Sequence, residues 1–332
     1  MAYDRRSVLR LAAASAASPA LAQSPSSAPP VKPGTLPDPT EVVPLWPDRP
    51  PGTRVLPHEQ VTDRVAASGF QDRFVTGIAK PSLTVFRPAR PNGAAVLIAP
   101  GGGYIRVVID KEGFEVGHRL AAAGITSFVL RYRLPGDGWE HPSDAPLQDA
   151  QRAMRLIRHG AAGFGVDPKR VAAMGFSAGG HVAASLATRH GAQVYAPIDA
   201  ADRDSARPDL SVLMYPVIDM ALPYAHGGSR EALLGKPPTP AQEAAYSPQR
   251  HVDRTTPPTF LCHAWDDPSV PTENSLNYLA ALRVAKVPAE AHIFAAGGHG
   301  FGIWGARRKP AAAWPDLFLA WAGSHGFMGA PT

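Results

Sequence analysis

Segments of apolar residues alternate with segments of helical spacing from about residue 70 to residue 325. Most of the apolar segments are apolar at successive positions, as in strands of a parallel sheet that helices cover on both faces. The pattern therefore predicts one α/β domain with a mostly parallel central sheet and helices on both faces. The expected strands are residues 73–78, 82–87, 94–99, 127–132, 170–175, 210–215, 259–263 and 289–295, and the expected helices are residues 113–123, 146–161, 178–188, 274–285 and 312–323.

The remaining segments flank or connect these elements. Residues 23–57 are rich in Pro, Ser and Gly without sustained periodicity, which predicts a tether before a folded domain over residues 58–332. Within the tether, the piece around Trp46 is expected to pack on the domain surface, because a tryptophan is rarely left in solvent. Residues 135–145 and 219–257 are long and rich in proline, and we expect them to be insertions over the edge of the sheet.

The N-terminal residues 1–22 have the order of features of an export signal. Adjacent arginines, Arg5 and Arg6, precede a short Ala-rich apolar run, and Ala20-Leu-Ala22 offers small residues at the positions that a signal peptidase reads. The apolar run is too short to span a bilayer. The paired arginines resemble a bacterial twin-arginine signal, although Asp4 replaces the usual Ser or Thr, so the twin-arginine and the general secretion routes both stay open. We expect cleavage before Gln23 and a periplasmic or secreted protein.

Charge and cysteine content exclude several classes of function. The formal net charge of the 332-residue chain is +5, and no run rich in Lys and Arg occurs beyond the N-terminus, so nucleic acid is not an expected partner. The single cysteine, Cys262, cannot form an internal disulfide or a zinc site built from thiolates. We expect Cys262 to be a buried strand residue.

One serine stands where an expected strand meets an expected helix. Gly175-Phe-Ser-Ala-Gly179 matches the G-x-S-x-G nucleophile elbow, a tight turn that lifts a serine hydroxyl above the carboxyl end of a parallel sheet. The turn strains the backbone of Ser177, and residues two positions away need to lack side chains to avoid collision. The following helix offers backbone N–H groups, including that of Ala178, to a developing negative charge. Ser177 is therefore the candidate nucleophile.

A serine hydroxyl needs a general base to accept its proton. His299 is the candidate base, because it lies between two glycines in a loop after residues 289–295, at the same sheet edge as Ser177. His181 lies four residues into the helix after the elbow, and we expect it to pack against the fold instead.

The base needs an acid that orients it, and in hydrolases with this elbow the acid precedes the histidine in the chain. Asp266 and Asp267 follow the expected strand at residues 259–263 and compete for this role. Asp219 is a weaker third candidate, because it follows an earlier strand. All three lie between the candidate nucleophile and the candidate base.

A glycine-rich loop, Pro100-Gly-Gly-Gly-Tyr104, follows the expected strand at residues 94–99. Glycines let backbone N–H groups approach and point at an oxyanion, so Gly102 and Gly103 join Ala178 as the candidate oxyanion hole. A phosphate-binding loop is the alternative, but no G-K-[ST] or G-x-G-x-x-G sequence follows. Tyr104 and Trp265 are candidate substrate-binding residues of the pocket.

Four features together resemble the α/β-hydrolase superfamily, in the esterase branch near bacterial acetyl esterases and hormone-sensitive-lipase-like enzymes. They are Pro100-Gly-Gly-Gly-Tyr104, Phe128-Val-Leu-Arg-Tyr-Arg-Leu134, Gly175-Phe-Ser-Ala-Gly-Gly-His181, and Asp267 with Gly298-His-Gly-Phe301. The resemblance covers about residues 75–325. Pro100 stands where the lipase branch usually has His, and Ala264 where relatives commonly have Gly. Asp267 precedes Pro-Ser-Val-Pro at the spacing of related hydrolases, which favours it over Asp266.

The resemblance implies a two-step acyl transfer through Ser177, His299 and Asp267, with no metal or organic cofactor. The expected function is an exported serine carboxylesterase for short acyl esters, such as acetyl groups on xylan, with a small-molecule or oligosaccharide ester as substrate. A serine peptidase of the prolyl-oligopeptidase type is an alternative, but it usually carries an N-terminal propeller, for which residues 23–70 are too few. A glycosidase would need two carboxylates across a sugar site. A hydrolase fold used only for binding would be expected to lack one of the three residues.

Overall fold

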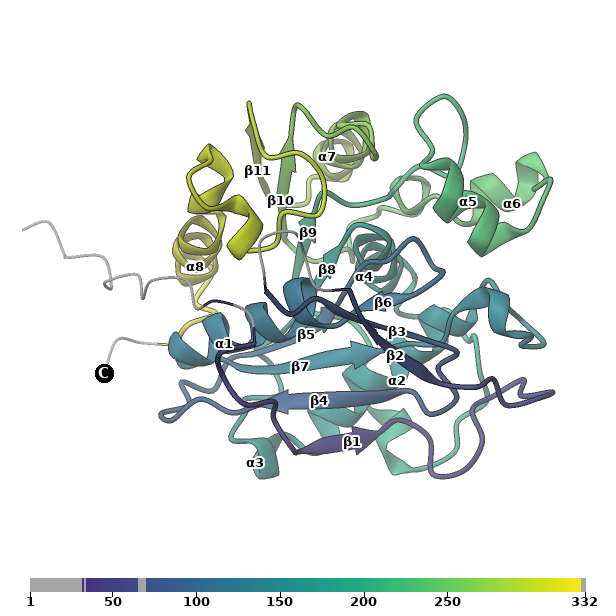
Figure 1. Ribbon diagram of the computed structural model, residues 1–332, viewed down its shortest axis with the longest axis horizontal. Helices are drawn as coiled ribbons and strands as arrows, with labels where there is room; N and C mark the ends of the chain where they lie inside the picture. The colour runs from purple at the N-terminus through teal and green to yellow at the C-terminus, as the bar shows by residue number, and fades with distance from the viewer. Residues whose placement is uncertain (1–31, 33, 65–69, 330–332) are drawn as a thin grey trace, which may run out of the picture.

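The structure is a computed structural model that describes residue 32, residues 34–64 and residues 70–329. Within these ranges, eight strands form the central sheet: β1 (Val42–Pro44), β4 (Ser82–Phe86), β5 (Ala95–Ala99), β7 (Thr126–Arg131), β8 (Val171–Phe176), β9 (Leu210–Met214), β10 (Thr259–Ala264) and β11 (Ala289–Phe294). Their order is β1-β4-β7-β5-β8-β9-β10-β11 (Figure 1). All neighbours from β7 to β11 are parallel, and β4 and β1 add antiparallel at one edge. The predicted mostly parallel sheet is confirmed.

Helices cover both faces of this sheet, as the sequence predicts. They are α1 (Glu115–Ala122), α2 (Ala145–His159), α3 (Ala161–Phe164), α4 (Ala178–Arg189), α7 (Glu273–Ala285) and α8 (Trp314–Ser324). Successive residues of β8 face opposite layers, because side chains alternate along a strand. Gly175 packs against Ala183 of α4, whereas the Phe176 ring lies 6.0 Å from the ring of Trp314 in α8. The sheet is therefore buried on both sides, which explains its continuous apolar strands.

The N-terminal part of the sheet begins earlier than the sequence predicts. Strand β1 pairs with β4, so the expected tether is folded from Val42 onward and the expected boundary at residue 57 lies within the domain. Trp46 packs on the domain, as expected, and is buried. Its indole N–H donates to Asp149 Oδ1 at 2.8 Å. The apolar β1 has three residues and ends in proline, which is too short a segment to be recognised as a strand from sequence.

A small second sheet and two helices are also absent from the sequence-based expectations, and the strand expected at residues 73–78 belongs to this second sheet and not to the central one. Among the described residues, β2 (Gln60–Asp63), β3 (Arg73–Thr76) and β6 (Val107–Val108) form an antiparallel three-stranded sheet. The segment expected as an insertion, residues 219–257, contains α5 (Gly227–Leu234) and α6 (Pro240–Ala245). Strand β2 is mostly exposed and β6 has two residues, so neither carries a recognisable apolar pattern.

Two further sequence-based predictions concern the N-terminus and the cysteine. The expected export signal, residues 1–22, lies outside the described residues, as does the first part of the expected tether. None of the helices in the described ranges combines the length and the apolar character needed to cross a membrane. Cys262 is buried in β10, as expected, and burial raises the pKa of its thiol.

Candidate active site

Ser177 occupies the sharp turn between β8 and α4. Its backbone φ is 53°, a left-handed conformation that is strained for a residue with a Cβ. A Cβ on Gly175 would lie 2.1 Å from the carbonyl oxygen of Gly179, and a Cβ on Gly179 would lie 2.1 Å from the carbonyl oxygen of Ala99. Only glycine fits at these two positions, so the sequence folds here into the tight turn that exposes the serine hydroxyl.

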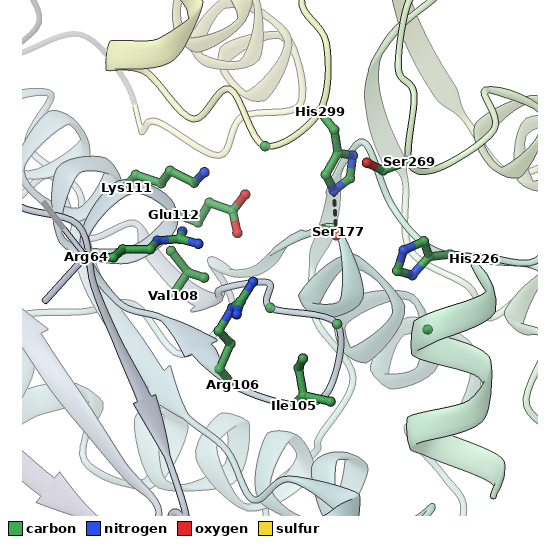
Figure 2. Close-up of a pocket in the computed structure, with 14 residues that line it drawn as sticks. Arg64, Ile105, Arg106, Val108, Lys111, Glu112, Ser177, His226, Ser269 and His299 are labelled. Atoms are coloured by element: carbon green, nitrogen blue, oxygen red, sulfur yellow. Dashed lines mark hydrogen bonds between the residues drawn. The ribbon is translucent and has the colours of Figure 1, made fainter. Parts of the chain in front are cut away.

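The structure brings together three of the residues that the sequence analysis assigns to catalysis. Ser177 Oγ lies 2.8 Å from His299 Nε2, the contact drawn in Figure 2. His299 Nδ1 lies 2.7 Å from Asp267 Oδ2. This geometry requires the neutral imidazole to carry its proton on Nδ1, which leaves Nε2 to accept the serine proton. Ser177, His299 and Asp267 follow β8, β11 and β10, so parallel strands deliver all three to one sheet edge.

The carboxylate of Asp267 is fully buried, and every one of its contacts is a hydrogen-bond donor. Oδ1 accepts from the backbone N–H of Ser269 at 2.8 Å and of Val270 at 2.9 Å, and Oδ2 also accepts from His263 Nε2 at 3.2 Å. Burial raises the pKa of Asp267, but the hydrogen bonds from His263 and His299 outweigh that effect and hold the pKa well below its ordinary value. Asp267 is therefore an anion at neutral pH.

Asp266, the competing candidate acid, does not contact His299. Its Oδ1 accepts from the backbone N–H of Gly297 at 2.8 Å and of Gly298 at 2.7 Å, and these bonds lower the pKa of its exposed carboxyl. Asp266 thus ties the loop after β10 to the loop that carries His299. The third candidate, Asp219, accepts from the backbone N–H of Ala221 and takes no part in the site.

The glycine loop places two backbone N–H groups beside Ser177. Gly102 and Gly103 have φ values of 134° and 67°, and a Cβ on Gly102 would lie 2.1 Å from the carbonyl oxygen of Arg106. Among the described residues, neither N–H has a hydrogen-bond acceptor. The N–H of Ala178 is likewise unused by its own helix, because Ala178 is the first residue of α4. These three groups can therefore donate to an oxyanion that forms on a carbonyl bound at Ser177.

A cavity of about 330 Å³ opens over Ser177. Ser177, His299, Gly102 and Gly103 line it together with charged and polar side chains, which Figure 2 shows on both sides of the serine. This volume lies near the lower end of the range for small-molecule sites.

The two residues expected to bind substrate do not line this cavity. Tyr104 is buried, and its O–H donates to His181 Nδ1 at 2.6 Å. Trp265 is 70% exposed on the surface. Tyr104 instead supports the fold with His181, whose Nε2–H donates to the carbonyl of Tyr246 at 2.7 Å. Burial lowers the pKa of His181 to about 4, so the predicted packing role of this histidine is confirmed.

Comparison with known proteins finds relatives that are named esterases or hydrolases. The BD-FAE family model matches residues 83–282, more than half of the chain. The chain belongs to the BD-FAE family. An acetylxylan esterase from Xylanibacter ruminicola is 35% identical over 229 residues, which are 68% of this chain and 44% of that protein. An endo-1,4-beta-xylanase B from Butyrivibrio fibrisolvens is 35% identical over 233 residues, 69% of this chain and 34% of that protein. The chain thus spans less than half the length of these two curated relatives.

Solved structures of similar fold also include ester hydrolases. An acetyl ester-xyloside bifunctional hydrolase from Caldicellulosiruptor lactoaceticus matches with a TM-score of 0.70 and 36% identity over 89% of this chain and 100% of that chain. A carboxylesterase from Lactobacillus plantarum matches with a TM-score of 0.62 and 25% identity over 83% of this chain and 100% of that chain. The predicted α/β-hydrolase fold and the resemblance to acetyl esterases are confirmed.

Several residues of this BD-FAE family member were missed by sequence reasoning. Glu112 is buried beside the glycine loop, where its Oε2 accepts from the N–H of Gly101 at 2.9 Å and its Oε1 from the hydroxyl of Tyr215 at 3.0 Å. It thereby fixes the start of the loop that carries the candidate oxyanion donors. For His263, the sequence predicts only the end of a strand. In neither case does a motif link the residue to the site.

His226 was also missed, because it lies in the segment read as an insertion. It caps α5, and its Nδ1 accepts from the N–H of Ser229 at 3.2 Å. Its proton is therefore on Nε2 in the neutral ring. Burial and the nearby charge of His299 lower the pKa of His226, which keeps the ring neutral at the cavity wall.

Metal ligands are not grouped in the part of the chain that the structure describes. No set of three or more His, Cys, Asp or Glu side chains in residues 32, 34–64 and 70–329 could hold a metal ion.

Proposed function

We propose that this protein is a serine carboxylesterase that removes short acyl groups, acetyl above all, from carbohydrate esters. The observation that carries the proposal is the chain of contacts from Ser177 Oγ through His299 to Asp267, beside unused backbone N–H groups in an open cavity. A nucleophile with its base, the acid that orients the base, and oxyanion donors are the parts that acyl transfer needs.

In the proposed mechanism, Ser177 Oγ attacks the ester carbonyl while His299 Nε2 accepts the hydroxyl proton. The negative charge that develops on the carbonyl oxygen is stabilised by the N–H groups of Gly102, Gly103 and Ala178. His299 then gives its proton to the departing alcohol, which leaves an acyl-enzyme. Water, deprotonated by His299, attacks the acyl carbon, and the acid is released with regeneration of Ser177. Asp267 stabilises the imidazolium in both steps and fixes the position of the ring.

The relatives support a carbohydrate ester as the substrate. One of them is an acetylxylan esterase, and a solved structure with 36% identity is an acetyl ester-xyloside bifunctional hydrolase. Cleavage of a glycosidic bond would need a pair of carboxylates across the sugar. Glu112 is the single carboxylate residue on the wall of the described cavity, and both of its oxygens accept hydrogen bonds. We therefore assign ester hydrolysis, rather than glycoside hydrolysis, to this site.

We further propose that the enzyme acts outside the cytoplasm. Arg5 and Arg6 before a short apolar run, and Ala20-Leu-Ala22 before Gln23, support export and cleavage. Polysaccharides do not enter the cytoplasm intact, so an exported enzyme would meet its substrate where the polymer is.

The test is the initial rate of p-nitrophenyl ester hydrolysis from acetyl to octanoyl, followed by acetate release from acetylated xylan. We expect the fastest turnover with acetyl and a loss of roughly 10⁶-fold in kcat for Ser177→Ala. Ser205→Ala is a matched control, because Ser205 is an exposed serine far from the cavity. Equal rates for the protein and Ser177→Ala, or no hydrolysis by either, would overturn the proposed function.

A further inference from the structure

The cavity over Ser177 has one side with a concentration of positive charge. Arg64, Arg106 and Lys111 line this side, which we call the cationic side, and Figure 2 shows their side chains on the opposite side of Ser177 from His226. The proposed mechanism uses none of the three. A neutral acetyl ester also offers no partner for them.

Arg106 is the residue of the cationic side nearest to the oxyanion donors. Its Cγ lies 2.9 Å from the position of a Cβ on Gly102, so its side chain starts against the glycine loop. The Arg106 guanidinium lies 5.2 Å from the centroid of the Phe74 ring, and that of Arg64 lies 5.8 Å from the same centroid. Two like charges therefore share one aromatic ring at the wall of the cavity. Burial and the charge of Arg64 lower the pKa of Arg106.

Within the described residues, Arg106 forms no ion pair, although the charge of Asp72 acts on it from a greater distance. No carboxylate lies within 4 Å of its guanidinium, and its buried Nε has no hydrogen-bond partner. Arg64, by contrast, forms an ion pair with Asp72 at 2.8 Å. A half-buried guanidinium without an acceptor is costly, and an anion from solution or substrate would satisfy it.

Lys111 adds a second unpaired cation beside the catalytic histidine. Its Nζ lies 3.3 Å from the position of a Cβ on Gly300, the residue after His299. In the described chain Lys111 forms no ion pair within 4 Å, and the oxygens of the adjacent Glu112 accept from Gly101 and Tyr215. Arg106 thus lies beside the glycine loop, and the Lys111 ammonium lies beside Gly300 in the loop that carries His299.

We propose that the cationic side binds a carboxylate group of the ester substrate. A carboxylate matches the planar guanidinium of Arg106 in two parallel hydrogen bonds and accepts a third from Lys111. The preferred substrates are then acidic esters. The carboxylate belongs either to the alcohol part, as in an acetylated uronic acid unit of a polysaccharide, or to the acyl part, as in a half-ester of a dicarboxylic acid. This inference rests on the proposed esterase function and specifies its substrate class.

Two pairs of substrates distinguish these sources. The first pair is an acetylated methyl glucuronoside and the matching acetylated methyl glucoside, and the second is the p-nitrophenyl monoester of succinate and p-nitrophenyl butyrate. We expect kcat/KM to favour the acidic member of one pair by about 10- to 100-fold, the usual value of a charge-assisted hydrogen bond. Arg106→Gln should reduce this preference about tenfold or more, and Arg106→Lys should retain part of it. Arg283→Gln is the matched control, because Arg283 is an exposed residue of α7.

Binding to Ser177→Ala gives a readout without turnover. Calorimetric titration should find tighter binding of methyl glucuronoside or succinate than of methyl glucoside, and added salt or Arg106→Gln should abolish the difference. Hydrolysis of all four esters without a preference for either acid would overturn the inference and leave the esterase proposal intact. If no ester is hydrolysed, the esterase proposal fails. In that case the titration alone tests the carboxylate site, and equal binding of acidic and neutral ligands would overturn it.

Discussion

The two sides of Ser177 differ in how their charged groups are bonded. On the side of the proposed acid and base, Asp267 accepts from two backbone N–H groups and two imidazoles. On the cationic side, Arg106 and Lys111 have no carboxylate partner among the described residues. Groups that must keep one geometry through a reaction are satisfied before substrate binds. Groups that recognise a substrate are left unsatisfied until it arrives.

The largest expected effect comes from changing Asp267, which lies on the side of the proposed acid and base. Asp267→Asn should lower kcat roughly 10³- to 10⁴-fold, because an amide at this position favours the wrong imidazole tautomer. Asp266→Asn is the matched comparison, since Asp266 bonds only to the backbone of Gly297 and Gly298. We expect a decrease of about tenfold or less for that variant. Steady-state kinetics with p-nitrophenyl acetate checks both, and a larger loss for Asp266→Asn would contradict the assignment of the acid.

The tight turn that carries Ser177 allows a second test, which measures stability. Gly179→Ala places a Cβ 2.1 Å from a carbonyl oxygen and should lower the free energy of unfolding by about 4 kcal/mol, as in a severe core mutation. Gly163→Ala in α3 meets no atom within 4 Å and should be neutral or stabilising by up to about 1 kcal/mol. Urea unfolding of the two variants measures the difference, and equal stabilities would mean that the elbow tolerates a side chain.

Glu115 extends the comparison to a buried group that lacks one partner. Burial raises its pKa to about 8, against hydrogen bonds from the N–H groups of Trp304 and Ile303, and its Oε1 has no partner among the described residues. The unfolded chain ionises near the ordinary value of 4.5, so the folded state binds more protons between pH 4.5 and pH 8. Stability contributed by Glu115 is therefore present below this window and is lost as pH rises through it.

Glu115→Gln should remove that loss. We expect the variant to be more stable than the parent above pH 8, by about 4 to 5 kcal/mol, and its stability to vary less with pH. Thermal and urea unfolding at several pH values measure this, with the exposed Glu290→Gln as the control. An unchanged pH dependence would show that Glu115 is ionised in the folded protein.

A smaller effect is expected at Glu112, which lies beside Lys111 and Arg64 on the wall of the cavity (Figure 2). In Glu112→Gln one acceptor becomes a donor, so the N–H of Gly101 or the hydroxyl of Tyr215 loses its partner. The glycine loop should then hold its oxyanion donors less firmly, and kcat should fall about tenfold with KM little changed. Steady-state kinetics of the variant checks this. An unchanged kcat would mean that the loop holds its conformation without Glu112.

The sequence predicted those parts of the molecule that depend on local pattern. The apolar runs predicted the parallel sheet, and the glycines around Ser177 predicted a turn that the structure has. Motif spacing also indicated His299 and Asp267, which the structure brings to Ser177. These features could be recognised because each is imposed by residues close together in the chain.

Features that depend on distant contacts could not be predicted in this way. Tyr104 follows the glycine loop in sequence, but its ring turns inward to His181, so adjacency to the loop did not make it a pocket residue. Strand β1 is stabilised by pairing with β4, and its three residues are too few to be recognised as a strand. Arg106 and Lys111 carry no motif, and their isolation from carboxylates is a property of the folded chain.

In the proposed mechanism, Ser177 carries the acyl group during hydrolysis. Acid quenching of the protein during turnover of p-nitrophenyl acetate, followed by proteolysis and mass spectrometry, tests it directly. We expect an acetyl group on the peptide that contains Ser177, and none on that peptide in Ser177→Ala. Acetylation of a different residue that tracks turnover, or continued hydrolysis by Ser177→Ala, would contradict it.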